Sequence, residues 1–181
     1  MDASELVRAI NTINASVEKA FENEIVSIIE KSIPPNGQMQ PITSPSNLKG
    51  FSVAGFYMIF NNDPNAPKQC TCHFSKNNKT YTCVYRGQAN PMKERVESHL
   101  FYSPTVRYDN CMLVTYNGSE YNIDISQPTL YQKGKEINGI GFPQYEWFVV
   151  KISLTNSKQA TREMFESVFD KKYGKPIYSH K

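Results

Sequence analysis

The sequence predicts an α+β fold: a small, mostly antiparallel central sheet flanked by helices and preceded by an N-terminal helical extension. Three observations predict this class. Apolar residues recur at three- and four-residue steps between residues 6 and 28, short alternating segments follow, and a second helical pattern lies near the C-terminus. We therefore divide the 181 residues into a helical extension, 1–35, and a main domain, 36–181, that is long enough to bury a core.

The first element is an amphipathic helical region that ends near Ser32, where residues 34–37 (Pro-Pro-Asn-Gly) stop it. Its apolar positions are Leu6, Ile10, Ile13, Val17, Phe21, Ile25 and Ile28. Asn11 and Asn14 are poor helix formers, so one long helix or two shorter ones would fit. The apolar face either packs against the domain body or serves in dimerisation or ligand clamping, and the pattern alone does not decide between these.

The elements of the main domain follow from alternation, periodicity and turn residues. Residues 36–50 are rich in Pro, Ser, Asn and Gly, which indicates a linker. Strands are expected at 51–60, 70–74, 81–85, 111–116 and 147–154, with a hairpin turn at 76–79. Helices are expected at 91–100, with Asn90 as N-cap, and at 158–173, with Gly174 just beyond the end.

Residues 117–144 form a polar, glycine-bearing stretch between two of these strands. We expect an irregular loop there, with room for one short strand at 121–125. A long irregular segment inside a compact domain is often functional.

The charge of the chain is divided unevenly. The formal net charge is +3, but residues 1–30 carry six acidic and two basic side chains, which leaves the remainder at +7. A basic body is compatible with a polyanion partner, although many domains carry such a charge. No signal peptide and no apolar run of about 20 residues is visible, so we expect a cytoplasmic protein without a membrane partner. Four cysteines at this length do not indicate a disulfide scaffold.

One constellation of residues carries chemistry. The segment Val84-Tyr85-Arg86-Gly87 lies in an expected strand and leads into a helix that carries Arg95 and, one turn later, His99. Gly55-Phe56-Tyr57 in an earlier strand adds a second phenol, and Glu166 on the last helix adds a carboxylate. A phenol, a guanidinium and an imidazole on one surface are groups that hold a phosphodiester and move protons around it. Together these residues indicate a nuclease site.

This pattern resembles the GIY-YIG nuclease family. That family has a tyrosine in each of two neighbouring strands, an arginine ten residues after the second, an aromatic or histidine one turn later, and a C-terminal glutamate on a helix. The resemblance covers residues 51–179, and the hairpin inserted between the two tyrosines is similar to insertions in the restriction-enzyme branch. Two positions depart from the pattern: Arg86 replaces an apolar residue, and Ser179 stands where an asparagine is expected.

The resemblance implies metal-dependent hydrolysis of a phosphodiester, with Mg²⁺ or Mn²⁺ as the cofactor. Arg95 would hold the scissile phosphate through its planar fork of donors. Tyr57 would activate the water, Tyr85 would hydrogen-bond the phosphate or the water, and His99 would pass the proton onward. Glu166 would bind the metal ion and thereby assist the leaving oxygen.

The choice of Glu166 over Glu163 follows from the helical projection of the last helix. Its apolar sector is formed by Met164, Phe165, Val168 and Phe169. Glu166 flanks that sector, whereas Glu163 lies nearly opposite it. Glu166 is therefore expected to reach the sheet, and Glu163 is expected to face solvent.

A second candidate site is the group Cys70, Cys72, His73 and Cys83. These ligand types suit zinc. A Cys-x-Cys in a strand, with Cys83 across the hairpin, is equally a set of neighbouring buried thiols.

The function expected from these residues is a metal-dependent endonuclease for double-stranded DNA, of the type II restriction kind. A double-strand break needs two such sites, which favours a homodimer on a palindromic target. The alternatives are a structure-selective repair or recombination nuclease, and an inactive nucleic-acid-binding protein of the same fold. Candidate DNA contacts, which equally fit ordinary solvated side chains, are Lys76, Lys79, Arg86, Lys93, Lys133 and Lys135.

Overall fold

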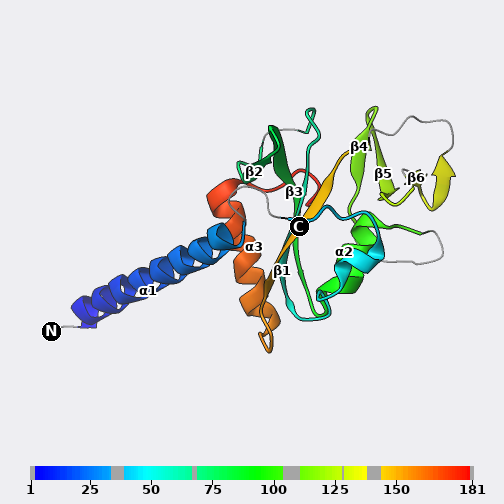
Figure 1. The fold of residues 1–181 in the computed structure, drawn as a ribbon. Helices are drawn as coiled ribbons and strands as arrows, with labels where there is room; N and C mark the ends of the chain where they lie inside the picture. Colours follow the sequence, from blue (N-terminus) through cyan, green and yellow to red (C-terminus); the bar gives the residue numbers. More distant parts are fainter. Residues whose placement is uncertain are drawn as a thin grey trace.

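The computed structural model describes residues 3–33, 39–66, 69–103, 111–127, 129–137 and 144–179. These residues form an α+β fold with three α-helices and two antiparallel sheets (Figure 1). The helices are α1 (Ala3–Ser32), the short 3₁₀ helix η1 (Pro45–Leu48), α2 (Met92–Leu100) and α3 (Gln159–Tyr173). No helix in the described ranges has the length and apolar character needed to cross a membrane.

The central sheet has the strand order β2-β3-β1-β8, and every neighbouring pair in it is antiparallel. Its strands are β1 (Gly55–Asn61), β2 (His73–Lys76), β3 (Lys79–Ala89) and β8 (Trp147–Ser153). All seven residues of β1 are buried, because this strand is central and both of its faces are covered. Tyr57 of β1 pairs with Gly87 of β3, which fixes the register at the candidate site.

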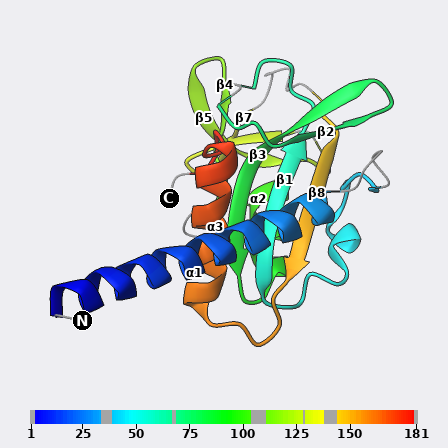
Figure 2. The same cartoon turned by 90° about the vertical axis from the view of Figure 1, so that its left-hand side faces the viewer.

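Helices cover both faces of the central sheet. Tyr57 and the other side chains on its face of the central sheet pack in one core with Val96 and Leu100 of α2. Phe56 and the side chains on the opposite face of the sheet pack in a second core with Phe169 of α3 and with the C-terminal half of α1. Figure 2 shows α1 and α3 in front of the sheet and α2 behind it. The side chains of one strand therefore alternate between two separate cores.

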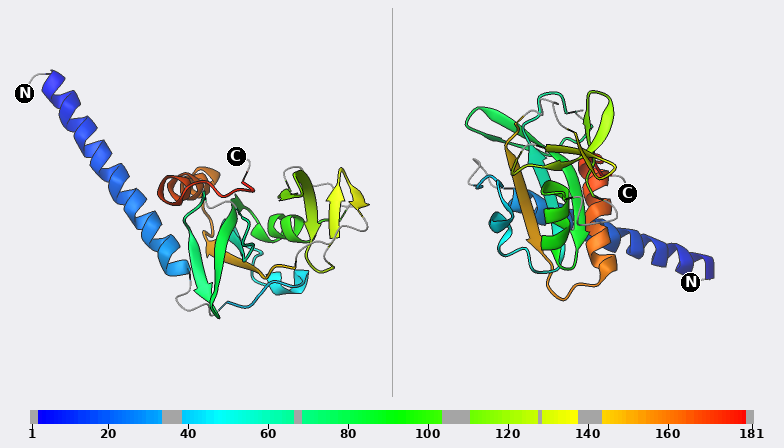
Figure 3. Two further views of the ribbon diagram at one scale, coloured as in Figure 1. Left: turned by 90° about the horizontal axis from the view of Figure 1, so that it is seen from above. Right: turned by 90° about the vertical axis from the view of Figure 1, so that its right-hand side faces the viewer.

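α1 is one continuous helix rather than two. Its C-terminal half is anchored, because Ile25 and Ile29 are buried in the second core. Its N-terminal half extends away from the body (Figures 1 and 3). The stop signal expected at residues 34–37 lies outside the described residues.

α2 begins one residue later than the sequence suggested. Its N-cap is Pro91 rather than Asn90, so the expected cap was wrong by one position. The backbone of Pro91 is extended and Met92 opens the helix, with its N–H bonded to the carbonyl of Val53. α3 begins at Gln159 and ends at Tyr173, with Gly174 as its C-cap, as expected.

The long loop expected at 117–144 was wrong, because most of that stretch belongs to a second sheet, whereas the short strand expected at 121–125 is confirmed by the strand Ser119–Asp124. The strands of that sheet are β4 (Val114–Tyr116), β5 (Ser119–Asp124), β6 (Thr129–Gln132) and β7 (Lys135–Ile137), in sequence order. Two-residue turns at 117–118 and 133–134 have positive φ at both residues, which is the type I′ geometry of tight hairpins. Asn117-Gly118 is itself a strong hairpin signal, and it was overlooked. Residues 138–143 of the expected loop lie outside the described ranges.

Candidate active site

Tyr57 and His99 form the buried centre of the site. His99 Nε2 lies 3.0 Å from the phenol oxygen of Tyr57, and the backbone N–H of Met112 donates to His99 Nδ1 at 2.8 Å. Because Nδ1 accepts a hydrogen bond, the ring proton of the neutral imidazole is on Nε2. His99 therefore donates to Tyr57. Burial, and then the charge of Arg95, lower the pKa of His99 to about 3, so the ring is neutral at physiological pH.

Tyr85 lies beside this pair. Its ring stacks on that of Tyr57, with centroids 6.2 Å apart and planes 16° apart, and its centroid is 4.3 Å from that of His99. Burial raises the pKa of both phenols. The interaction with Tyr85 raises the pKa of Tyr57 further. Hydrogen bonds run in one direction from the Met112 backbone through His99 to Tyr57.

Gly87 makes room for the two phenols. It lies opposite Tyr57 in the β1–β3 register. A Cβ atom at this position would lie 2.6 Å from the phenol oxygen of Tyr57 and 3.0 Å from Cε1 of Tyr85. The requirement for glycine here comes from this close approach and not from an unusual backbone angle.

Arg95 supplies positive charge to the same place. It lies on α2 one turn before His99, so both side chains lie on the same side of the helix. Its charge lowers the pKa values of Tyr57, Tyr85 and His99. A cation in this position favours an ionised phenol and attracts an anionic substrate.

Glu166 reaches the site from α3. Its charge raises the pKa values of Tyr57 and Tyr85. Arg86 Nη1 contacts Glu166 Oε1 at 3.0 Å. Burial raises the pKa of Glu166, and the Arg86 charge opposes that rise. The side chain of Glu166 remains 22% exposed, which leaves it accessible to a ligand.

Arg86 also binds a second carboxylate on α3, that of Asp170. The guanidinium donates from Nε to Oδ1 at 3.0 Å and from Nη2 to Oδ2 at 2.6 Å, which is the bidentate geometry of a strong pair. Asp170 follows Glu166 by four residues, so both carboxylates lie on one face of α3. Arg86 thereby fixes Glu166 relative to β3.

Ser179 covers the edge of β3 at Arg86. Its hydroxyl accepts a hydrogen bond from the N–H of Arg86 at 3.0 Å and donates to the carbonyl of Arg86 at 3.4 Å. The N–H of the preceding Tyr178 donates to the carbonyl of Val84 at 2.9 Å. The C-terminal segment therefore runs beside β3 and holds the strand where Arg86 and Tyr85 diverge to opposite faces.

The five residues expected to be catalytic lie together in the structure, although they come from four elements between positions 57 and 166. Sequence reasoning missed three contributors to the site: Asp170, the Met112 backbone and the closeness of Gly87 to the phenols. The i, i+4 spacing from Glu166 was a usable signal for Asp170. The role of Met112 had no signal in the sequence.

Arg86 does not occupy the surface position expected of a nucleic-acid contact. It is only 6% exposed, and its guanidinium is bound by two carboxylates. The sequence suggested a DNA contact because arginine is normally exposed, whereas the pairing with α3 makes its burial favourable.

The candidate lysines lie in three separate places. Lys76 and Lys79 flank the turn of the β2–β3 hairpin, where Lys76 donates to the carbonyl of Met39 at 2.6 Å and Lys79 pairs with Glu146 at 3.3 Å. Lys79 and Gly87 are eight residues apart on β3, or about 26 Å at strand spacing. Lys133 and Lys135 lie at the β6–β7 turn. Lys93 is on α2, the helix that carries Arg95.

The described residues contain no group of three or more His, Cys, Asp or Glu side chains arranged for a metal ion. This contradicts a zinc site at Cys70, Cys72 and Cys83, which are free, buried thiols, while His73 is exposed and bonded to the carbonyl of Thr71. A single carboxylate such as Glu166 nevertheless suits Mg²⁺, which retains several waters and takes further ligands from substrate phosphates.

Glu163 lies on the solvent side of α3. It is exposed and accepts a hydrogen bond from Gln159 at 2.7 Å. The helical projection correctly separated this residue from Glu166.

Comparisons with known proteins give no assignment: no family model matches the chain, and no curated protein or solved structure matches it.

Proposed function

We propose that this protein is a divalent-metal-dependent DNA endonuclease with a GIY-YIG-like catalytic domain, acting as a type II restriction-type enzyme on double-stranded DNA. The observation that carries the proposal is the convergence of Tyr57, Tyr85, His99, Arg95 and Glu166. The phenol of Tyr57 is hydrogen-bonded to a neutral imidazole, the ring of Tyr85 contacts both, and the charges of Arg95 and Glu166 act on both phenols. Hydrolysis of a phosphodiester needs this combination of charge neutralisation and an oriented water.

Arg95 is the residue that would bind the scissile phosphate. It is the cation whose charge reaches both phenols and His99, and its planar fork of donors matches two phosphate oxygens. Glu166 would hold Mg²⁺ or Mn²⁺, which supplies charge neutralisation at the leaving oxygen when bound. The ion pairs from Arg86 to Glu166 and Asp170 keep the Glu166 carboxylate oriented for that purpose.

Burial and hydrogen bonding suggest different roles for the two phenols. Tyr57 is buried, accepts a hydrogen bond from His99, and has a pKa well above normal. Tyr85 is only half-buried, with its ring stacked on that of Tyr57, so its phenol is the more accessible of the two. We therefore assign contact with the attacking water to Tyr85, with Tyr57 and His99 as positioning residues. Arg95 and a bound cation would both lower the pKa of Tyr85 towards the working range.

A second candidate function is nucleic-acid binding without cleavage. The observation in its favour is the ion pair between Arg86 and Glu166, because a carboxylate already bound by a guanidinium is a weaker metal ligand. In this case Arg95 would still bind phosphate, and no strand would be cut.

The experiment that separates these functions is digestion of supercoiled plasmid by the full-length protein with Mg²⁺ or Mn²⁺ and with EDTA. Discrete metal-dependent fragments would support the restriction-type enzyme. Arg95→Ala and Glu166→Ala should abolish cutting, whereas Glu163→Ala, which removes an exposed carboxylate from the same helix, should not. Retarded but uncut DNA would identify a binding protein. A protein that neither cuts nor retards DNA would contradict both functions.

A further inference from the structure

The N-terminal half of α1 exposes six large apolar side chains. They form a surface that we call the exposed stripe: Leu6 (50% exposed), Val7 (56%), Ile10 (46%), Ile13 (61%), Val17 (56%) and Phe21 (58%). Figures 1 and 3 show that this part of the helix extends away from the rest of the chain. The described chain therefore offers no cover for the exposed stripe.

A helix of this kind needs a partner. Helices in proteins are stabilised mainly by the packing of an apolar face rather than by the intrinsic helix propensity of their residues. Where α1 meets the body, Ile25 and Ile29 supply that packing. N-terminal to these two residues, the exposed stripe also needs packing, but the body of the protein does not reach it.

We propose that the exposed stripe binds the exposed stripe of a second copy of this chain, so that two α1 helices pair in a homodimer. Four of its residues recur with alternating spacings of four and three: Leu6, Ile10, Ile13 and Val17. This is the period that places apolar residues along the seam of two paired helices, with β-branched Ile10 and Val17 in equivalent heptad positions. A stripe with this period is complementary to itself, as a two-fold interface requires.

The area of the exposed stripe suits a dimer. Six side chains that are about half exposed present on the order of 600 Å² per chain, at the upper end of the largest patch on a typical monomer. Covering this surface in two copies removes on the order of 1,200 Å² from water, the lower end of the range for specific protein–protein interfaces.

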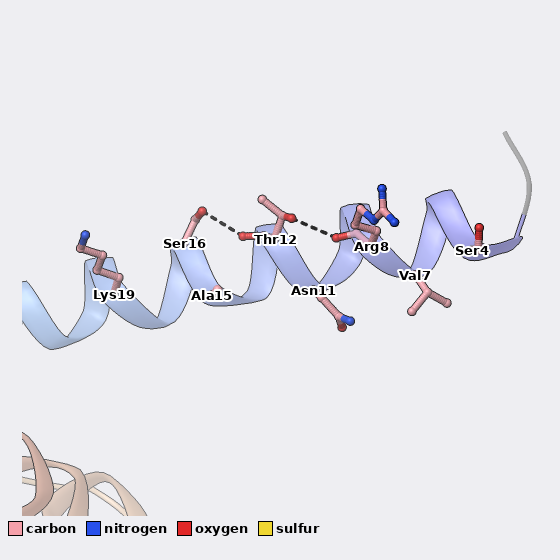
Figure 4. A pocket seen from close by; sticks show the side chains of 8 residues that line it. All are labelled: Ser4, Val7, Arg8, Asn11, Thr12, Ala15, Ser16 and Lys19. Carbon is pink, nitrogen blue, oxygen red and sulfur yellow. Dashed lines mark hydrogen bonds between the residues drawn. The ribbon is translucent and has the colours of Figure 1, made fainter.

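The charges of α1 argue against other partners. The helix carries five glutamates and three basic residues, of which Glu22 pairs with Lys171 of α3 at 2.7 Å. Figure 4 shows a neighbouring part of the helix surface, which Val7 of the exposed stripe borders and whose other side chains are small or polar: Ser4, Arg8, Asn11, Thr12, Ala15, Ser16 and Lys19. A helix that lies on an anionic membrane has a polar face rich in Lys and Arg, and a DNA-binding helix is basic. α1 has neither property, whereas a second copy needs only the apolar match.

The test is the mass of the full-length protein in solution, measured by sedimentation or light scattering over a wide concentration range. We expect twice the chain mass of 20.7 kDa. Ile13→Glu should give a monomer, because it places a charge in the middle of the seam. Ala15→Glu adds the same charge on the opposite face and should remain a dimer. Thermal unfolding checks that both variants are folded, and Val17→Glu provides an independent disruption of the seam.

Three outcomes would overturn the proposal. One is a monomer at every concentration, and another is a dimer that persists in both Ile13→Glu and Val17→Glu. The third is a monomer that binds vesicles of anionic phospholipid through the exposed stripe. Because the readout is mass rather than cleavage, a dimer that does not cut DNA would count against the proposed nuclease alone. A monomer that cuts DNA would count against the pairing alone.

Discussion

His99 donates its Nε2 proton to the phenol of Tyr57 while its Nδ1 accepts the backbone N–H of Met112. Both ring nitrogens of the fully buried His99 are thus hydrogen-bonded, and only the tautomer protonated on Nε2 satisfies both bonds. A second proton would have to displace the Met112 N–H from Nδ1. We therefore propose His99 as a neutral positioning residue in place of the proton relay expected from the sequence, and the neutral buried ring has consequences for stability.

The first prediction concerns stability against pH. The pKa of His99 is lowered from its ordinary 6.5 to about 3 in the folded protein, so the unfolded chain binds more protons between these values. The stabilising contribution of neutral His99 is therefore fully present above pH 6.5 and is lost progressively as the pH falls towards 3. We expect His99→Asn to be less stable at neutral pH and to lose less stability on acidification. Urea unfolding at several pH values measures this, and parallel curves for the two proteins would contradict it.

The second prediction concerns Ser179. Ser179→Ala removes the hydroxyl that accepts the buried N–H of Arg86, and an unsatisfied buried donor costs about 1–3 kcal/mol of unfolding free energy. Ser179→Thr keeps the hydroxyl and should cost less. Ser75→Ala, at an exposed position of the same sheet, is the matched control. Equal unfolding free energies for Ser179→Ala and wild type would show that water replaces this bond without loss.

The third prediction concerns Gly87. Gly87→Ala would place a methyl group 2.6 Å from the phenol oxygen of Tyr57, in a position where the ring is held by His99. Overpacking of this kind costs about 1–3 kcal/mol, and it should also misalign both phenols and reduce cleavage. Thr80→Ala, at an exposed position on β3, should leave unfolding and cleavage unchanged. Wild-type stability and cleavage in Gly87→Ala would mean that the phenols move aside freely.

The fourth prediction separates the two carboxylates that hold Arg86. Asp170→Ala removes the bidentate partner of the guanidinium, which then has a stronger interaction with Glu166. Since Glu166 is also the proposed metal ligand, cleavage by Asp170→Ala should require more Mg²⁺. If Asp170 had a purely structural role, its loss would leave the metal dependence of cleavage unaltered. A titration of cleavage against Mg²⁺ at a temperature where the variant is folded measures this. An unchanged midpoint would contradict competition between Arg86 and the metal ion.

Local patterns predicted those parts of the site that depend on local structure. Arg95 and His99 could be placed on one helix face from their spacing, and the projection of α3 distinguished Glu166 from Glu163, because both inferences use only helical geometry. The bond between Arg86 and Asp170 joins residues 84 positions apart, so no local pattern contains it. Burial of Arg86 was missed for this reason, since its partners become neighbours only when α3 packs on the sheet.

The errors in the fold expected from the sequence have a similar explanation. The sequence indicates strands where β4 and β5 lie but not β6 and β7, because the latter are only four and three residues long and carry few apolar residues. The pairing in this second sheet is fixed by tight turns such as Asn117-Gly118 rather than by hydrophobic alternation. In α1, the two asparagines lowered the helix propensity, but the helix is continuous, so propensity was a poor guide there.

The last prediction distinguishes the two phenols. Tyr57→Phe removes the acceptor of the His99 Nε2 proton inside the core, so it should destabilise the fold by about 1–3 kcal/mol and also reduce cleavage. Tyr85→Phe removes a hydroxyl from a half-buried ring, so its effect on unfolding should be smaller. If Tyr85 contacts the attacking water, its loss should nevertheless abolish cleavage. Comparing unfolding free energy with single-turnover cleavage for both variants tests this division of roles. The roles would be reversed if Tyr85→Phe cut DNA while Tyr57→Phe were inactive but as stable as the wild type. Tyr57 would then be the phenol that acts on the water.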